Sequence, residues 1–240
     1  MLQSYLHNHF IPWDALVRRA GGSEIEIASL IEAKAAPGIV YCLNSNGECW
    51  SALAAFVGTA QPERSSDGMA FYASSAIYWL RRGRLLMRDG LNANSAASAN
   101  RDGFLEQFSA ALQAEPLAAE NYPEVFPSGR FDSHSAREAG LKEWAGWISG
   151  AYAVCLRSFT GTTCVTKEAL ARRLRTQFVD GAPDIGSVEA LDLVERLSTF
   201  LMPFAPFERT NGTPGRAVDR VLTFLNLGND EPFVNAWAVS

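Results

Sequence analysis

The chain has 240 residues, 48% of them hydrophobic and 20% charged, which is typical of a folded protein with a full hydrophobic core. Its formal net charge of −5 at pH 7 argues against a general nucleic-acid-binding protein, which would carry a basic surface. No apolar run reaches the roughly 18 residues of a membrane span, and the N-terminus lacks the basic and apolar segments of a signal peptide, so we expect a cytoplasmic protein without a membrane partner.

The cysteines and histidines follow no metal-ligand spacing. Cys42, Cys49, Cys155 and Cys164 are most simply reduced thiols, and the histidines add no zinc pattern, so we expect no metal and no other cofactor. Most of the basic residues are arginines. This bias is typical of a GC-rich genome, although arginine forks also suit the recognition of oxyanions.

Residues 13–36 predict two helices joined by a tight turn, the outline of a helix-turn-helix. Gly21 and Gly22 end the first helix, and Ser23 with Glu26 three positions later forms a capping box that opens the second. The second helix is acidic, whereas a DNA-reading helix needs cations for phosphate contact. We therefore expect a structural or protein-contacting role for this helix pair and no nucleic-acid partner.

A short β-branched run at residues 38–43 is the best strand candidate. A turn leads from it to residues 49–57, which periodicity leaves open between a hairpin strand and a helix. Residues 69–82 predict a helix. The stretch between residues 64 and 88 holds five arginines and one acid, so it is either a solvated helix end or a surface for an anion or an acidic partner.

The middle of the chain alternates polar and helical stretches. The small, polar residues 91–100 predict a mobile loop or a boundary between layers, and residues 104–112 predict a helix. Ser135 and Glu138 form a second capping box, at the start of a long helix that we expect to continue to Cys155.

Three glycines, at positions 140, 146 and 150, interrupt that long helix. Each interior glycine costs roughly 0.5–1 kcal/mol relative to alanine. We therefore expect another backbone or a ligand to approach the helix closely there.

Apolar stripes predict three more helices. They are marked by Leu170, Leu174 and Phe178, by residues 188–201, and by residues 214–225, the last with Thr213 as cap and Pro214 at its first position.

The fold class is therefore mainly α, with a small β element near residues 38–57. We expect a helix-turn-helix-like N-terminal region at residues 1–60, which has room for a hairpin, and a helical main domain at residues 61–240.

No recognised catalytic signature stands in the sequence, which has no Gly-rich phosphate loop, no GxSxG elbow and no HExxH. The candidates for chemistry are single residues. Lys167 and Glu168 are expected to open a helix, where Glu168 complements the helix dipole or Lys167 serves a cleft as charge donor or base. Glu208 and Arg209 follow a segment made rigid by two prolines, and they are either a site pair or a structural ion pair.

Further candidates flank or follow the start of the long helix. Arg130 and His134 lie near this start, and His134 suits proton transfer because its ordinary pKa lies near neutrality, although a surface histidine is the simpler interpretation. Tyr152 and Cys155 lie on one helical face. We expect Cys155 to be packed rather than nucleophilic, because no second histidine stands ready to activate it.

Several short motifs carry a family resemblance. They are the helix-turn-helix outline with its exit Pro37-Gly38-Ile39-Val40-Tyr41, then Gly150-Ala151-Tyr152-Ala153-Val154-Cys155-Leu156, Lys167-Glu168, and Phe204-Ala205-Pro206-Phe207-Glu208-Arg209. Together they resemble a bacterial family of uncharacterised natural-product biosynthesis proteins. The chain departs from the family pattern at Ala153, where a second glycine is usual, and at Phe207, where histidine is common.

The resemblance implies work on a small anionic metabolite, without metal or nucleotide, beside a protein partner from the same gene cluster. The chain is also similar to aziridine-forming proteins of azinomycin-type pathways, which implies a lyase- or cyclase-type ring closure in which an amine displaces a sulfate. Arginines would receive the charge on the sulfate, and a carboxylate would keep the amine neutral. The residues assigned are, for substrate binding, Arg130, Arg209, Arg216 and Tyr152, and, for catalysis, Glu208, Lys167, His134 and Glu168.

Two other functions stay open, and so does the question of whether this chain is an enzyme. One is a non-catalytic subunit that stabilises a partner enzyme, with the helix pair and exposed apolar residues as the interface. The other is a helix-turn-helix regulator that responds to a small ligand, and the acidic second helix argues against it.

Overall fold

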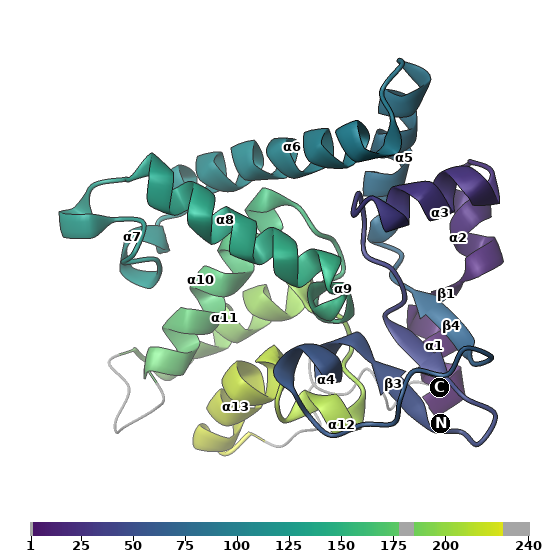
Figure 1. The fold of residues 1–240 in the computed structure, drawn as a ribbon. Coiled ribbons are helices and arrows are strands. Elements are labelled where there is room, and N and C mark those ends of the chain that lie inside the picture. Colours follow the sequence, from purple (N-terminus) through teal and green to yellow (C-terminus); the bar gives the residue numbers. More distant parts are fainter. Residues whose placement is uncertain (1, 178–184, 228–240) are drawn as a thin grey trace. The chain divides into compact units, whose positions relative to one another are not determined.

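The computed structural model describes residues 2–177 and 185–227, and these residues form a mainly helical fold with one small sheet (Figure 1). This confirms the expected fold class. The chain forms two compact units, each made of two segments: Met1–Glu106 with Gly140–Phe159, and Gln107–Ala139 with Thr160–Ser240. We call them the first and the second unit. The boundary at residue 60 stays a prediction.

The sheet of the first unit is antiparallel, with the strand order β1-β4-β2-β3. Its strands are β1 (Ile11–Pro12), β2 (Tyr41–Leu43), β3 (Cys49–Ser51) and β4 (Met69–Tyr72). The stretch that periodicity left open forms both structures, because β3 is followed directly by α4 (Ala52–Val57). The change occurs at Ser51, whose hydroxyl accepts hydrogen bonds from the first backbone N–H groups of α4.

The expectation of a helix from residue 69 is wrong for its first residues, which form β4. Phe71 pairs with Pro12 of β1 on one side and with Tyr41 of β2 on the other. Pairing with two strands therefore decides the conformation of a segment whose composition suits strand and helix alike. The helix α5 begins only at Ala76 and continues to Arg88.

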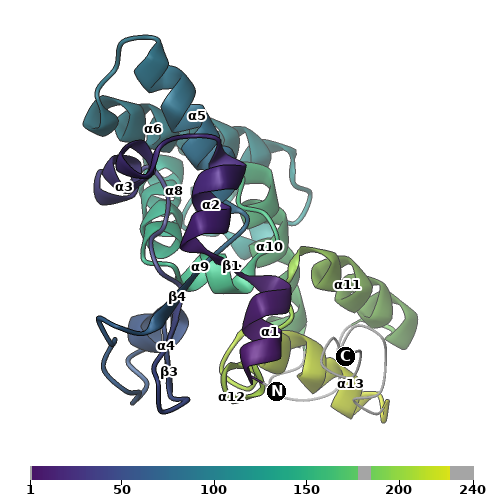
Figure 2. The ribbon, with the colours of Figure 1, turned by 90° about the vertical axis from the view of Figure 1, so that its right-hand side faces the viewer.

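The two helices expected at residues 13–36 are present, and a helix and a short strand that the sequence did not predict precede them. After α1 (Leu2–His9), β1 leads into α2 (Trp13–Ala20), and α3 (Glu24–Glu32) comes next (Figures 1 and 2). The capping box is confirmed, because the backbone N–H of Ser23 donates to Glu26 Oε2 at 2.8 Å and the Ser23 hydroxyl accepts from the Glu26 N–H at 3.3 Å.

The expectation of a loop at residues 91–100 is wrong, because α6 spans Ala93–Ala114. Asn92 caps the helix by accepting a hydrogen bond from a first-turn N–H at 2.9 Å. The fully buried Asn100 then donates to two backbone carbonyl oxygens distant in sequence, at 2.9 and 3.1 Å. Long-range hydrogen bonds thus order a segment whose composition is typical of a loop.

The prediction of a capping box at Ser135 and Glu138 is also wrong. The helix α8 spans Ser133–Ile148, and its cap is Asp132, whose Oδ1 accepts from the Ser135 N–H at 2.7 Å. Ser135 is therefore already inside the helix, and a cap acts only on the N–H groups at the end. The hydrogen bond to Ser135 also lowers the pKa of Asp132.

The long helix breaks before Cys155. Gly150 has a left-handed φ of 90° and separates α8 from α9 (Ala151–Cys155). A Cβ on Gly150 would lie 2.8 Å from the Cβ of Ala52, and one on Gly146 would lie 2.9 Å from the Tyr152 ring. A close approach therefore exists at both glycines, but side chains make it, whereas the sequence predicted another backbone or a ligand.

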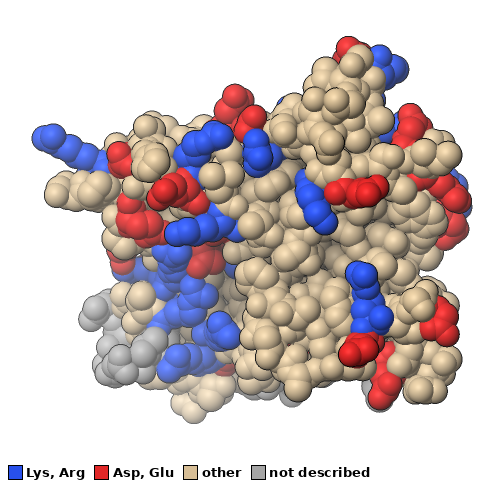
Figure 3. Space-filling view, in the orientation of Figure 1, with Lys and Arg blue, Asp and Glu red and all other residues tan. Residues whose placement is uncertain are grey.

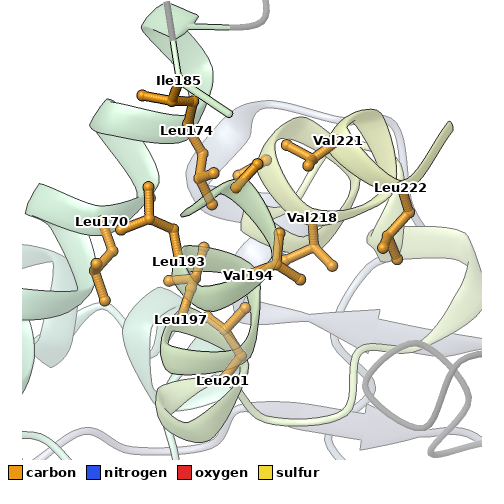
Figure 4. Close-up of a cluster of buried hydrophobic side chains, with 13 residues drawn as sticks. Leu170, Leu174, Ile185, Leu193, Val194, Leu197, Leu201, Val218, Val221 and Leu222 are labelled. Carbon is orange, nitrogen blue, oxygen red and sulfur yellow. The ribbon is translucent and has the colours of Figure 1, made fainter. Parts of the chain in front are cut away.

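The second unit contains several helices. They are α7 (Ala118–Asn121), the 3-10 helix η1 (Pro127–Gly129), α10 (Gly161–Gln177), α11 (Ser187–Phe200), α12 (Pro206–Arg209), the π-helix η2 (Pro214–Asp219) and α13 (Arg220–Phe224). Leucine and valine side chains from α10, α11, η2 and α13 gather between these helices as a buried core (Figure 4). No helix in the described part of the chain is long and apolar enough to cross a membrane.

The helix boundaries of the second unit match the sequence in part. Pro214 stands at the first position of its helix as expected, but Thr213 makes no side-chain cap hydrogen bond. Val188, at the start of α11, is 75% exposed, so the apolar stripe of that helix begins later than expected. Phe178 lies outside the described residues.

Candidate ligand pocket and buried ion cluster

The first unit contains a pocket of about 360 Å³ beside α2 and α3. Two aromatic side chains line it, Trp13 and Tyr72, whose ring centroids are 5.5 Å apart. Three charged residues, Glu32, Lys34 and Arg64, also line it. The remaining lining residues are apolar or small and include Ile31, Ile39 and Ile148.

The backbone conformation at the end of α3 places Lys34 at the pocket. The N–H of Ala35 donates to the Leu30 carbonyl at 2.9 Å and the N–H of Lys34 to the Ile31 carbonyl at 3.0 Å, which is a Schellman motif. Lys34 takes its left-handed position, with φ 67°, where glycine is usual. A lysine in a position that costs backbone energy is a signal of function, because such strain concentrates at binding sites.

Arg64 lies in the irregular segment that precedes β4, and Tyr72 lies in β4 itself. The guanidinium carbon of Arg64 is 5.6 Å from the centroid of the Trp50 ring, so a cation–π contact positions it. Tyr72 is the last residue of β4 and is 9% exposed. Burial raises the pKa of Tyr72, although the charge of Arg64 partly offsets this, so the phenol is protonated at neutral pH and can donate a hydrogen bond to a ligand.

Three hydrogen-bond donors of the pocket are available to a ligand. Within residues 2–177 and 185–227, the side chains of Lys34, Arg64 and Tyr72 make no hydrogen bond and no ion pair with one another or with another side chain. Among the lining residues in the described part of the chain, Glu32 is the single acid, so positive charge exceeds negative by one. The pocket therefore suits a ligand with one negative charge and an apolar body.

A second arrangement of charged residues centres on Glu168 in the second unit. Glu168 Oε1 accepts from Arg172 Nε at 3.0 Å and from Arg175 at 2.8 Å, and Oε2 accepts from Lys167 Nζ at 3.2 Å. Burial raises the pKa of Glu168, but the charges of Lys167, Arg175 and Arg172 outweigh burial and hold this pKa at about 2. The carboxylate is therefore ionised at all physiological pH values.

The neighbours of α10 complete this cluster. The guanidinium carbon of Arg172 lies 4.6 Å above the centroid of the Tyr122 ring, and Arg173 pairs with Glu120 of α7 at 2.6 Å. Figure 3 shows basic and acidic side chains interspersed over the surface formed by α7 and α10. Exposed pairs of this kind contribute little to stability, whereas the buried Glu168 contributes more.

Lys167 and Glu168 do not open a helix, contrary to the expectation from sequence, because α10 begins at Gly161. The Thr160 hydroxyl caps α10 by accepting from the Thr163 N–H at 3.1 Å. Gly161 lies so close to the backbone of Gln107 and Phe108 that a Cβ would overlap with it.

The other predicted residues of the second unit occupy different positions. Glu208 is buried, at 5% exposure. Arg209 binds Asp219 through two hydrogen bonds of 2.8 and 2.6 Å, so it forms an ion pair with a residue that the sequence analysis did not assign to it. Arg216 and Arg130 are exposed.

His134 and Tyr152 complete the predicted set. His134 is exposed, with Nε2 3.5 Å from Oε1 of Glu138 one turn further along α8. Tyr152 belongs to the first unit, where its ring packs on Gly146. The structure thus brings Lys167 and Glu168 together, whereas His134 and Arg209 have partners outside the predicted set.

Sequence reasoning missed the pocket residues as a group, although two signals pointed to them. Arg64 belongs to the arginine-rich stretch that the sequence offers as an anion surface, and Lys34 is the one cation near the end of an acidic helix. Within the described ranges, no three His, Cys, Asp or Glu side chains are grouped so as to hold a metal ion.

The fold and the pocket define a mainly helical protein with a candidate binding site for a small anion. Residues 101–225 match the model of a family described as Family of unknown function (DUF6058), and because the match covers more than half of the chain, the protein belongs to this family. No curated protein and no solved structure matches the chain. The matched residues include the Glu168 cluster, whereas Trp13, Lys34, Arg64 and Tyr72 precede them.

Proposed function

We propose that this protein binds a small anionic metabolite in natural-product biosynthesis, with the pocket of the first unit as its binding site. The observation that carries the proposal is the set of three donors, Lys34, Arg64 and Tyr72, which line one pocket with no hydrogen-bond or ion-pair partner among the described side chains. A single oxyanion satisfies an ammonium, a guanidinium and a phenol hydroxyl at once. The resemblance of the motifs supports the biosynthetic context.

The size and the apolar lining of the pocket favour an organic ligand over an inorganic ion. The volume of about 360 Å³ lies within the range of roughly 300–1,000 Å³ that is typical of small-molecule sites. Ile31, Ile39 and Ile148 offer the hydrophobic contact that a carbon skeleton requires.

Calorimetric titration with cyclohexanecarboxylate and with its uncharged amide, at low ionic strength, tests the proposal. We expect the acid to bind at least about tenfold more tightly, because a hydrogen bond to a charged group is worth roughly 1.5–3 kcal/mol. Arg64→Gln should weaken binding of the acid by a similar factor. Arg88→Gln, at an exposed arginine outside the pocket, is the matched control and should change nothing. Equal binding of acid and amide would contradict the proposal.

The resemblance implies a reaction besides this binding, namely ring closure with displacement of sulfate, whose assigned residues Glu168, Glu208 and Arg209 belong to the second unit and do not line the pocket of the first unit. The amine nitrogen forms a bond to carbon, the bond from that carbon to the sulfate oxygen breaks, and a carboxylate takes the ammonium proton. Glu168 is a weak base because its pKa is about 2, so Glu208 is the better candidate among the assigned carboxylates. Unchanged turnover of a pathway intermediate by the double variant Glu208→Gln, Arg209→Ala would remove this reaction.

The alternative of a non-catalytic subunit is favoured by one surface feature. All residues of α4 are apolar, and two of them, the adjacent Phe56 and Val57, are 57% and 46% exposed. Exposed apolar side chains side by side are typical of a protein interface. Co-purification with the product of a neighbouring gene tests this function, and loss of the complex in the double variant Phe56→Ser, Val57→Ser would support it.

A further inference from the structure

The geometry points to a planar aromatic monocarboxylate as the ligand of the pocket, with the ring against Trp13 and Tyr72 and the carboxylate on Arg64, Lys34 and the Tyr72 hydroxyl. The inference rests on the function proposed above and names its ligand class.

The two aromatic rings are held together by strand pairing. Ile11 pairs with Tyr72 and Pro12 with Phe71, so the end of β1, where the chain enters α2 at Trp13, is fixed beside the end of β4. The rings of Trp13 and Tyr72 are 5.5 Å apart and inclined by 48°. Inclined rings at this spacing offer both a face and an edge, and aromatic pairs prefer offset or edge-to-face contacts at about 4.5–7 Å.

The hydrogen-bond donors of the pocket lie beside its aromatic rings, so the carboxylate of a bound ligand must lie close to the ligand's own ring. The Tyr72 hydroxyl and the Tyr72 ring belong to one side chain, and the charge of Arg64 acts on that hydroxyl. A carboxylate that reaches both donors while its carbon body stacks on the rings must therefore be attached directly to that body or through a short link. Arg64 presents a planar fork, which matches a carboxylate in two parallel hydrogen bonds.

The charge balance of the lining favours one negative charge on the ligand. Lys34 and Arg64 carry two positive charges and Glu32 one negative charge. A dianionic phosphate monoester would leave one charge without compensation and would be repelled by Glu32. A monocarboxylate neutralises the single excess positive charge of the lining.

Calorimetric titration of the full-length protein at pH 7 with benzoate, cyclohexanecarboxylate and phenyl phosphate tests the inference. We expect benzoate to bind about two- to tenfold more tightly than cyclohexanecarboxylate, the range that an aromatic pair adds beyond buried area. Phenyl phosphate should bind more weakly than benzoate. Trp13→Leu should abolish the preference for benzoate, whereas Tyr78→Leu, at an exposed tyrosine of α5 outside the pocket, should keep it.

A second variant guards against misfolding of Trp13→Leu. Tyr72→Phe keeps the ring and removes the hydroxyl, so it should weaken both acids by the same factor and leave the preference for benzoate intact. Circular dichroism melting curves establish that each variant folds.

Each result distinguishes the ligand class from the proposed function. Equal affinity for both acids with a loss on Arg64→Gln would overturn the aromatic class and leave the anion-binding function standing. Binding of phenyl phosphate more tightly than benzoate would overturn the inference that the anionic group of the ligand is a carboxylate. If neither acid binds, or if binding ignores Arg64, both the ligand class and the proposed function fail.

Discussion

Lys34 combines backbone strain with a place in the pocket. A residue other than glycine in the left-handed region costs roughly 1–2 kcal/mol, and Lys34 has a φ of 67°. We expect Lys34→Gly to raise the free energy of unfolding by about 1 kcal/mol and at the same time to weaken carboxylate binding. Urea denaturation and calorimetric titration measure the two effects.

The control for this variant is Lys34→Ala, which removes the charge but keeps a Cβ in the left-handed position. It should weaken binding without raising the free energy of unfolding. A Lys34→Gly variant that binds as tightly as the wild type would show that the ammonium group does not contact the ligand.

Glu168 links the stability of the fold to pH. Its folded pKa of about 2 lies below the ordinary 4.5, so the stabilisation is present above about pH 5 and is lost as the pH falls toward 2. We expect Glu168→Gln to lower the free energy of unfolding at pH 7 by on the order of 3 kcal/mol. The variant should also lose part of the acid dependence that the wild type shows in urea denaturation between about pH 5 and pH 2.

Glu189→Gln is the matched control for Glu168, because Glu189 is 57% exposed and lies 3.9 Å from Arg173. It should change the free energy of unfolding by less than about 0.5 kcal/mol. Equal effects of the two substitutions would mean that Glu168 is solvated like a surface carboxylate.

The same cluster shows where residue-level sequence reasoning fell short. Arg172 and Arg175 follow Glu168 by four and seven positions, so all three share one helical face. Because the sequence predicted Glu168 at the start of a helix, Glu168 was interpreted through the helix dipole, and its contacts with the two arginines were not predicted. The spacing of Glu168, Arg172 and Arg175 predicts the cluster only if α10 begins at Gly161, well before Glu168.

At the scale of elements, Gly161 holds the start of α10 against another segment of the second unit. A Cβ at this position would overlap with the backbone of Gln107 and Phe108, and backbone atoms cannot rotate away as a side chain does. We expect Gly161→Ala to lower the free energy of unfolding by about 1–3 kcal/mol, the usual cost of overpacking. Thermal or urea denaturation measures the change.

Gly186, the cap of α11, is the control position for this prediction. It has an extended φ of −70° and no atom within 4 Å of an added Cβ. Gly186→Ala should therefore cost less than about 1 kcal/mol, which is the cost of a poorer cap. If both substitutions cost the same, the close approach at Gly161 is not what positions α10.

The elements that the sequence misplaced share one cause. Residues 69–72 became β4 because Phe71 pairs with two strands, and residues 91–100 became part of α6 because Asn100 bonds to distant carbonyl oxygens. Local propensity is weak for such short or polar segments, and tertiary contacts override it. The amphipathic helices, by contrast, carry their periodicity within a few turns and were placed correctly in most of their length.

At the scale of the whole molecule, a ligand that binds only the folded chain must stabilise it. We expect benzoate at 100 times its dissociation constant to add about 2.7 kcal/mol to the free energy of unfolding. The measurement is urea denaturation with and without benzoate. Arg64→Gln at the same benzoate concentration should gain clearly less, and an equal gain would place the binding elsewhere on the protein.

The sequence by itself determined the mainly helical fold class, the paired helices at residues 13–36 and the capping box of Ser23 and Glu26, because these depend on residues within one or two turns of one another. Only the tertiary structure decided the sheet order and the pocket. Trp13, Lys34, Arg64 and Tyr72 come from four separate places in the chain, and no spacing rule connects them. Their meeting depends on strand pairing and on the left-handed end of α3, which the contacts of the folded chain stabilise.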